Sequence, residues 1–196
     1  MADDNTIRLA RGLKPLVSRV RTDVTAVKKA DGVQAWTRQA LTEARLIQHC
    51  NGGPARGVCP VREGESVTLV ALLDFDSHKG EVSWDAMSTV VRRVVDVLEL
   101  AWGMSPVLFR SSGGRGVHLY LLWDEPQDCY SVRAWLREVL EGVGLKSGAG
   151  GLVKNEVEVF PKQDGVKTGG FGSQFILPLA GRSEPLGWGD EGETLW

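Results

Sequence analysis

The strongest constraint on the fold is the order of the apolar patterns that follow residue 66. Val67–Asp76 is a continuous apolar run rich in β-branched residues, which predicts a buried strand. The patterns after it predict a helix over 84–102, strands over 107–110 and 117–123, a helix over 130–141 and a strand over 156–160. The resulting order is β-α-β-β-α-β, which is typical of a split βαβ unit.

This order also predicts which strands are neighbours. Right-handed crossovers place the first strand between the third and the fourth, and both neighbours run antiparallel to it. The end of Val67–Asp76 therefore meets the beginnings of the strands over 117–123 and 156–160. We predict an α+β protein with an RRM-like core and an N-terminal helical segment.

The flanking regions give weaker signals. Apolar residues at helical spacing predict helices over 13–27 and 34–49, and residues 54–66 read as a loop or short strand. A further strand is expected over 173–177. We expect one catalytic domain over 1–182, with a helical part over 1–53 and the core over 67–182, and an acidic, glycine-rich tail or linker over 183–196.

Composition narrows the class of protein. The chain has 196 residues, of which 42% are hydrophobic and 24% charged, as in one globular domain. No apolar stretch is long enough to span a membrane, and the acidic N-terminus does not resemble a secretory signal. Three cysteines form no disulfide framework, so we expect a cytoplasmic protein. A net charge of −2 excludes a strongly basic nucleic-acid coat.

Two acidic positions end the first strand of the core. Asp74 and Asp76 lie two residues apart, so their side chains share one face of the strand. Carboxylates suit hard cations such as Mg²⁺ or Mn²⁺. A third carboxylate would complete a two-metal site, and of Glu156 and Glu158 we favour Glu158. Taken alone, an Asp-x-Asp pair is more often a strand end that meets solvent.

A glycine-rich loop precedes the third strand. Ser112, Gly113, Gly114 and Arg115 offer a hydroxyl, close backbone approach and a guanidinium, which together can hold phosphate. His118 follows at the start of the strand, and Lys162 follows the third acid. Lys167 and Arg182 are weaker candidates. An ordinary hairpin loop and solvated surface charge are the alternatives.

A zinc site is the least supported possibility. His49, Cys50 and Cys59 include no Cys-x-x-Cys pair and no clear fourth ligand.

Three of these segments together resemble the catalytic domain of the archaeo-eukaryotic primase superfamily, the primase–polymerases. They are Leu73-Asp74-Phe75-Asp76, the run from Ser112 to His118, and Val157-Glu158-Val159. The second is very similar to the matching loop in polymerase domains of bacterial end-joining ligases. The third, with the residues after it, looks more like enzymes of phages, plasmids and mobile elements. The third acid is Glu where many relatives have Asp.

The resemblance implies metal binding by Asp74, Asp76 and Glu158, and contact of Ser112, Arg115 and His118 with nucleotide phosphates. It implies primer synthesis and extension on a single-stranded DNA template from NTPs or dNTPs, with two Mg²⁺ or Mn²⁺ ions. It also implies a catalytic part of a longer protein, often one with a fused or associated helicase. The alternatives are an end-joining repair polymerase without de novo priming, and a non-catalytic single-stranded nucleic-acid-binding module.

Overall fold

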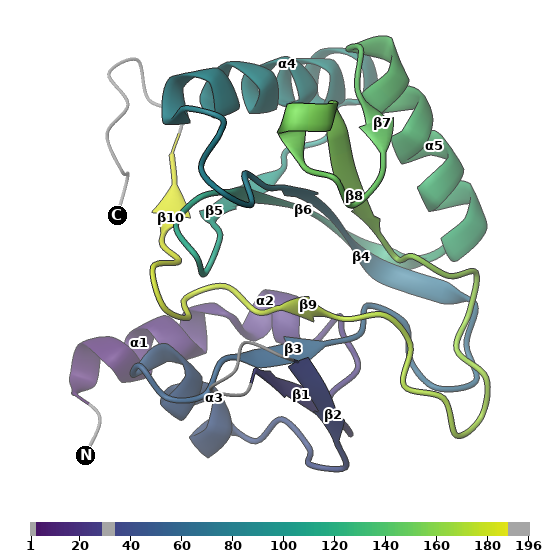
Figure 1. The fold of residues 1–196 in the computed structure, drawn as a ribbon. Helices are drawn as coiled ribbons and strands as arrows, with labels where there is room; N and C mark the ends of the chain where they lie inside the picture. The colour runs from purple at the N-terminus through teal and green to yellow at the C-terminus, as the bar shows by residue number, and fades with distance from the viewer. Residues whose placement is uncertain (1–2, 29–33, 188–196) are drawn as a thin grey trace.

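The chain folds into two β-sheets that face each other, and helices cover the outer face of the large sheet. This computed structural model describes residues 3–28 and 34–187. The large sheet has the strand order β10-β5-β6-β4-β8-β7, and the small sheet has the order β2-β1-β3-β9. Figure 1 shows the small sheet beneath the large one, with α4 and α5 on the far side of the large sheet.

The large sheet has the predicted RRM-like topology. Its central strand β4 (Val67–Phe75) pairs antiparallel with β6 (Val117–Asp128) and with β8 (Glu156–Phe160). Strand β5 (Val107–Arg110) lies beyond β6. The predicted position of the first strand between the third and fourth is therefore confirmed. Strand β6 continues five residues further than expected, since Asp124-Glu125-Pro126 does not end it.

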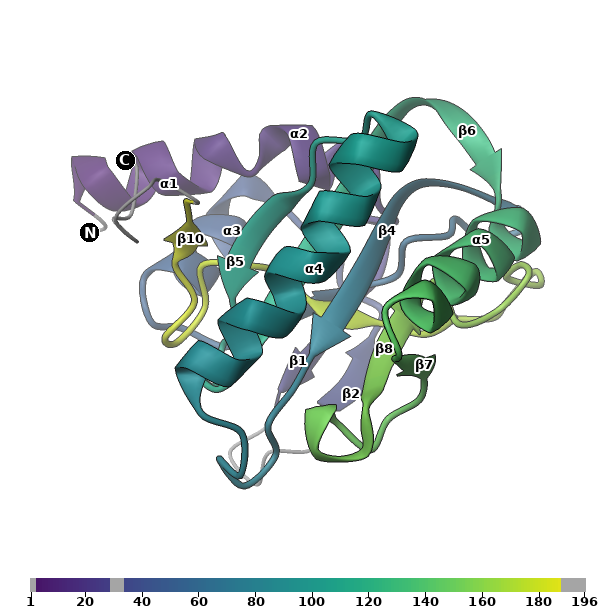
Figure 2. The ribbon, with the colours of Figure 1, turned by 90° about the horizontal axis from the view of Figure 1, so that it is seen from above.

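Two amphipathic helices cover one face of the large sheet. They are α4 (Trp84–Trp102) and α5 (Cys129–Gly142), and both cross that face in Figure 2. The Ser83 side chain caps the first turn of α4, and Gly103 ends it with φ of 63°, which a glycine adopts without strain. Their buried apolar side chains, including Val91, Leu98 and Leu136, form one core with Leu73 and Leu119 of the sheet.

The N-terminal part is less helical than predicted. It contains α1 (Asp4–Gly12), α2 (Lys14–Val17) and α3 (Glu43–Cys50), but also β1 (Thr25–Lys28), β2 (Gln34–Thr37) and β3 (Arg56–Val58). Both predicted helices were therefore wrong over part of their length. Apolar residues from Leu13 to Val20 are buried as a helix would bury them, whereas β-branched Val24, Thr25 and Val27 favour the strand that follows.

The C-terminal segments join both sheets. The strand expected over 173–177 is β9 (Phe175–Ile176), and it pairs with β3 of the small sheet. The short elements β7 (Lys146–Ser147) and η1 (Leu152–Lys154) precede β8. Residues 185–186, which we expected in the tail, form β10 (Pro185–Leu186) and extend the large sheet beside β5. The rest of the expected tail, from 188, lies outside the described residues.

An apolar cluster holds the two sheets together. Leu72, Tyr120 and Phe160 from the large sheet pack with Phe175 and Leu177 from the segment that contains β9. The Phe175 ring meets those of Tyr120 and Phe160 edge to face, with centroids 5.7 and 5.9 Å apart. Across the described part of the chain, no helix has the length and apolar character needed to cross a membrane.

Candidate active site

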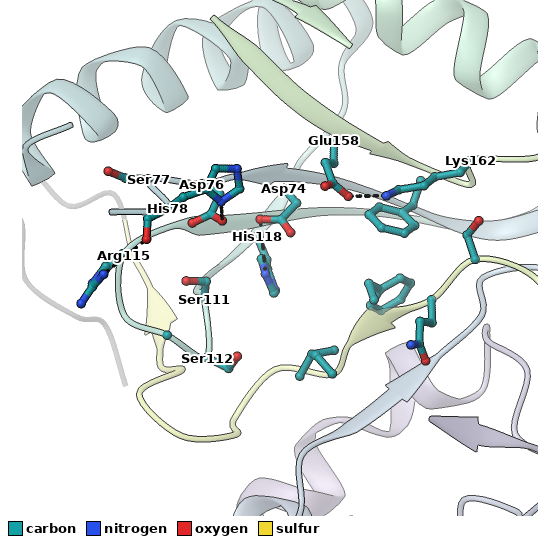
Figure 3. A pocket seen from close by; sticks show the side chains of 16 residues that line it. Asp74, Asp76, Ser77, His78, Ser111, Ser112, Arg115, His118, Glu158 and Lys162 are labelled. Carbon is teal, nitrogen blue, oxygen red and sulfur yellow. Dashed lines mark hydrogen bonds and ion pairs between the residues drawn. The ribbon is translucent and has the colours of Figure 1, made fainter. Parts of the chain in front are cut away.

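A polar pocket of about 780 Å³ opens between the two sheets, beside this apolar cluster. Figure 3 shows its side chains: acids come from β4 and β8, and the glycine-rich loop closes one end. The residues that line it are Asp74, Asp76, Ser77, His78, Ser111, Ser112, Gly113, Arg115, His118, Glu158, Phe160, Lys162, Ser173, Gln174, Phe175 and Ile176. The three sequence segments singled out above therefore meet in one pocket.

Strand register brings the acids together. Asp74 lies directly opposite His118 of β6 on one side and Glu158 of β8 on the other. Such cross-strand neighbours project to the same face with Cβ atoms about 5 Å apart. Asp76 follows at the end of β4, on the same face as Asp74 by the two-residue period.

The surroundings of Asp74 disfavour its charge. Desolvation by burial is the largest cause and raises the pKa of the Asp74 carboxyl, and the nearby Asp76 and Glu158 raise it further. His118 acts in the opposite direction, with its Nε2 3.5 Å from Asp74 Oδ1. A cation between the acids would relieve this repulsion.

The donor set fits divalent cations, because hard ions prefer carboxylate oxygens. Two of the acids are meanwhile paired with side chains of the protein. His78 Nδ1 lies 2.6 Å from Asp76 Oδ2, and Lys162 pairs with Glu158. As the side chains lie, the described residues contain no group of three His, Cys, Asp or Glu side chains arranged to hold a metal. Metal binding would therefore replace the contacts of His78 and Lys162.

His78 was missed by the sequence reasoning. Its Nε2 is 2.9 Å from the Ala149 carbonyl oxygen while Nδ1 faces Asp76, so both ring nitrogens meet acceptors. The Ala149 bond first, and then the charge of Asp76, raise the pKa of His78. The signal available in the sequence was its place two residues after Asp76.

His118 is buried, unlike His78. Its side chain is 7% exposed, and Nδ1 lies 3.3 Å from the Tyr120 hydroxyl. The hydroxyl donates in turn to the Ile176 carbonyl oxygen at 3.5 Å. This chain of contacts fixes the ring between the acids and the small sheet.

The glycine-rich loop is a tight turn against the end of β4. Gly114 N–H donates to the Ser111 carbonyl, and Ser111 N–H to the Gly116 carbonyl, both at 2.8 Å. A Cβ on Gly116 would lie 2.3 Å from the Phe75 carbonyl oxygen, so only glycine fits there. Ser112, Gly113 and Arg115 line the pocket, whereas Gly114 forms the turn with φ of 76°.

Basic residues occupy two ends of the pocket. Arg115 is exposed and donates from Nη1 to the His78 carbonyl oxygen at 3.3 Å. Lys162 lies at the other end, with Nζ 4.7 Å from the centre of the Phe160 ring. The weaker candidates Lys167 and Arg182 do not line the pocket.

Glu156 lies outside the pocket. Its Oε2 accepts from Gly150 N–H at 2.7 Å, and its Oε1 is 3.2 Å from Lys146 Nζ. Of the two acids on β8, the favoured Glu158 is therefore the one that faces Asp74.

The small sheet supplies a wall that the sequence did not indicate. Ser173, Gln174, Phe175 and Ile176 line the pocket opposite the acids. They lie far from Asp74 along the chain, and only the pairing of β9 with β3 brings them there.

The residues considered for zinc have a structural role. His49 is buried, with Nε2 2.8 Å from the Pro178 carbonyl oxygen and Nδ1 accepting from Arg56 N–H at 2.9 Å. Cys59 is buried in a separate apolar cluster with Cys129.

Comparisons with known proteins bear on this site. Residues 12–187 match the family described as "TOTE conflict system, Archaeo-Eukaryotic Primase domain". A comparison with curated proteins finds no match. Among solved structures, the polymerase domain of Mycobacterium tuberculosis Ligase D in complex with DNA is similar, with a TM-score of 0.59 and 16% identity over 89% of this chain and 74% of that one.

A second solved structure is the archaeo-eukaryotic primase domain of the cyanophage S-2L primase–polymerase. It has a TM-score of 0.47 and 15% identity over 85% of this chain and 94% of that one. At these identities the likeness to the Ligase D domain shows the fold alone, and it agrees with the predicted α+β architecture.

Proposed function

Because the chain belongs to the archaeo-eukaryotic primase domain family of TOTE conflict systems, we propose that it is a template-dependent nucleotidyltransferase that synthesises and extends primers. Its substrates are NTPs or dNTPs, and its template is single-stranded DNA. The observation that carries the proposal is the register of Asp74 with Glu158 and His118, opposite the glycine-rich loop in one pocket.

Asp74, Asp76 and Glu158 are the residues that would hold Mg²⁺ or Mn²⁺. Bound there, two such ions would lower the pKa of an attacking hydroxyl and offset the negative charge of a pyrophosphate leaving group. The pKa of the Asp74 carboxyl, raised first by desolvation and then by the neighbouring acids, supports this assignment, since a bound cation would offset both effects.

The other side chains bind and orient the nucleotide. Arg115 and Ser112 lie at the loop end of the pocket, where a guanidinium and a hydroxyl can hold phosphate oxygens. His118 lies between that loop and Asp74, so its ring can donate to a phosphate oxygen near the reacting centre. Phe160 and Phe175 give the pocket an apolar side suited to a base or sugar.

A non-catalytic RRM-like binder is disfavoured by burial. Such modules stack bases on exposed aromatic residues of the central strands. Here Phe75 and Tyr120 are 0% and 1% exposed, and acids take the open positions.

The proposal is tested by primer synthesis on single-stranded DNA with labelled NTPs and dNTPs, in Mg²⁺ or Mn²⁺. We expect products from unprimed template. Extension of a supplied primer only, with tight binding to a 5′-phosphorylated break, would favour an end-joining polymerase. No incorporation under any of these conditions would contradict both.

A matched pair of arginine variants tests the nucleotide contact. Arg115→Ala should raise the KM for nucleotide about 10-fold or more, because a charge-assisted phosphate bond contributes about 1.5–3 kcal/mol. The Kd for single-stranded DNA should stay unchanged. Arg93→Ala, an exposed arginine on α4, is the control. Equal losses in KM and Kd would show that the loop holds template instead.

A further inference from the structure

A second hollow, of about 250 Å³, lies at the edge of the large sheet next to the active-site pocket. Strand β7 pairs with β8 only at residues 146–147, so the edge of β8 beyond Val157 has no neighbouring strand. The hollow forms there, between that edge, helix α5 and the segment at Gly148 and Ala149. It shares Glu158 and Lys162 with the active-site pocket, and Figure 3 shows the ion pair between these two side chains.

A buried arginine lines this hollow, and one nitrogen of its guanidinium group has no hydrogen-bond partner among the residues that the structure describes. Arg133 of α5 is 9% exposed, and its Nη2 pairs with Asp164. Its Nη1 is buried and has no hydrogen-bond partner among the described residues. A buried donor without an acceptor disfavours the folded state, and a charged donor does so more strongly. Arg133 therefore brings a buried positive charge to the wall of the hollow, with one of its donors unpaired.

A second arginine adds to this charge. Arg137 follows one turn later on α5, so it projects to the same side as Arg133. It lines the hollow, is exposed, and makes no ion pair within the described part of the chain. The charged residues that line the hollow are Arg133, Arg137, Lys162 and Glu158. Glu158 pairs with Lys162, and Asp164, which lies outside the lining, pairs with Arg133. Both acids are already paired, so Arg137 is in excess and the hollow favours an anion.

We propose that this hollow is a second phosphate-binding subsite, distinct from the loop at residues 112–116. Its ligand is a phosphate of the strand being made: the 5′-triphosphate of an initiating nucleotide or a backbone phosphate of a primer. The loop lies on the β6 side of Asp74 and the hollow on the β8 side. When an incoming nucleotide is held at the loop, the β8 side of Asp74 is left for the nucleic-acid strand being made. This last assignment rests on the proposed function, whereas binding of the anion does not.

The first experiment measures anion binding without catalysis. Inorganic pyrophosphate is titrated into the chain in the absence of divalent metal, and the amide NMR signals of Gly148 and Ala149 are followed. We expect saturable shifts that persist in Arg115→Ala and in the control Arg93→Gln, and that require at least fivefold more pyrophosphate in Arg137→Gln. Absence of shifts in the wild type, or equal affinity in Arg137→Gln, would overturn the proposal.

Arg133 is tested separately because its substitution can disturb the fold. Arg133→Lys keeps the charge, and thermal melting establishes whether it is folded. If it is, its pyrophosphate affinity should fall at least as far as that of Arg137→Gln. An unchanged affinity in folded Arg133→Lys would remove Arg133 from the subsite and overturn the role assigned to its unpaired nitrogen.

The second experiment identifies the source of the phosphate. Initiation is measured with either a nucleoside 5′-triphosphate or the matching 5′-hydroxyl nucleoside in the first position, and the two rates are compared. Extension is measured separately on a supplied primer. Loss of the triphosphate preference in Arg137→Gln identifies the initiating nucleotide, and a raised KM for primer alone identifies the backbone phosphate. If Arg137→Gln is active and shows neither of these changes, the strand assignment is overturned. An inactive wild type that still binds pyrophosphate would contradict the proposed function and leave the anion site standing.

Discussion

Asp74 illustrates how the requirements of a site and of a fold oppose each other at one residue. Its carboxyl is desolvated and faces two other acids, so its pKa is raised and its charge disfavours the folded state at neutral pH. Nothing in the packing of the strand requires a carboxylate, because the neighbouring Leu73 and Phe75 supply the buried contacts. The acid therefore reflects the chemistry of the pocket.

We predict that Asp74→Asn reduces nucleotide addition at least 100-fold without lowering the melting temperature in metal-free buffer. Loss of a metal-binding carboxylate removes several kcal/mol of transition-state stabilisation, and about 1.4 kcal/mol is a factor of ten. Removing a repelled charge leaves stability equal or slightly higher. Near wild-type synthesis by this variant would contradict the metal assignment.

Two glutamates of β8 give a matched test of the third ligand. Glu158→Gln should abolish synthesis, whereas Glu156→Gln should keep it, because Glu156 binds Gly150 N–H and Lys146 outside the pocket. The cost of Glu156→Gln should appear instead as a slightly lower melting temperature. The same assay and thermal melting of both variants give the comparison, and equal activities would exclude Glu158 as a ligand.

Among the elements, the glycine-rich turn is the one on which the site geometry most depends. Gly116→Ala would place a Cβ 2.3 Å from the Phe75 carbonyl oxygen, between β4 and the loop, whereas Gly113→Ala meets nothing within 4 Å. We predict a loss of about 2 kcal/mol or more in the free energy of unfolding for Gly116→Ala, because its clash is with backbone, and less than about 0.5 kcal/mol for Gly113→Ala. Urea unfolding of the pair measures the difference. Equal stabilities would contradict the tight packing of the turn.

The elements also differ in how well the sequence predicts them. Helix α4 and strands β4, β5 and β8 follow from local signals: apolar periodicity, a serine cap and a terminal glycine. The small sheet does not, because β3 finds its partner β9 far along the chain. Short strands such as β1 carry few residues, and Val27 of β1 and the preceding Val24 also fit helical spacing. Tertiary pairing decided their conformation.

The same distinction applies to the candidate site. Asp74, Glu158 and His118 could be brought together from the sequence because the topology of one βαβ-type unit fixes their register. Ser173 and Gln174 could not, since their place in the pocket depends on contacts between two sheets. Arg133 and Arg137 were also beyond reach, because the hollow they line exists only where β7 stops pairing.

One histidine contact joins α3, β3 and the segment after β9, and it predicts a pH dependence of stability. Burial lowers the pKa of His49, whose Nδ1 accepts from Arg56 N–H. As the pH falls below about 6.5, His49 takes up a proton in the unfolded chain at a higher pH than it does in the folded chain. The free energy of unfolding therefore falls by at most about 1.4 kcal/mol per pH unit. His49→Gln should show a flatter decline between pH 7.5 and 5.5 in urea unfolding. Parallel profiles would contradict the prediction.

At the scale of the whole molecule, charge determines how the chain meets its template. The formal net charge is −2, and three arginines of the N-terminal part are paired with acids within the fold. Arg11 lies 3.6 Å from Glu43, Arg19 pairs with Asp124, and Arg21 is buried against Asp23 and Glu63. Leu13 and Leu16 meanwhile pack into the core between the sheets. These contacts favour a structural role for the N-terminal helices.

We therefore predict weak binding of single-stranded DNA, with a slope of log K against log salt of roughly −1 to −3, since each neutralised phosphate contributes about −0.7. Removing residues 1–30 is an unsuitable test, because it would delete β1 and its pairing with β3. The triple substitution Arg8→Gln, Arg11→Gln and Lys14→Gln keeps the helices and removes their exposed charge. Titration of a labelled oligonucleotide at several salt concentrations should give the same slope for the variant and the wild type. A slope flattened by one unit or more would place the template along α1, and tight, steeply salt-dependent binding by the wild type would contradict the charge argument itself.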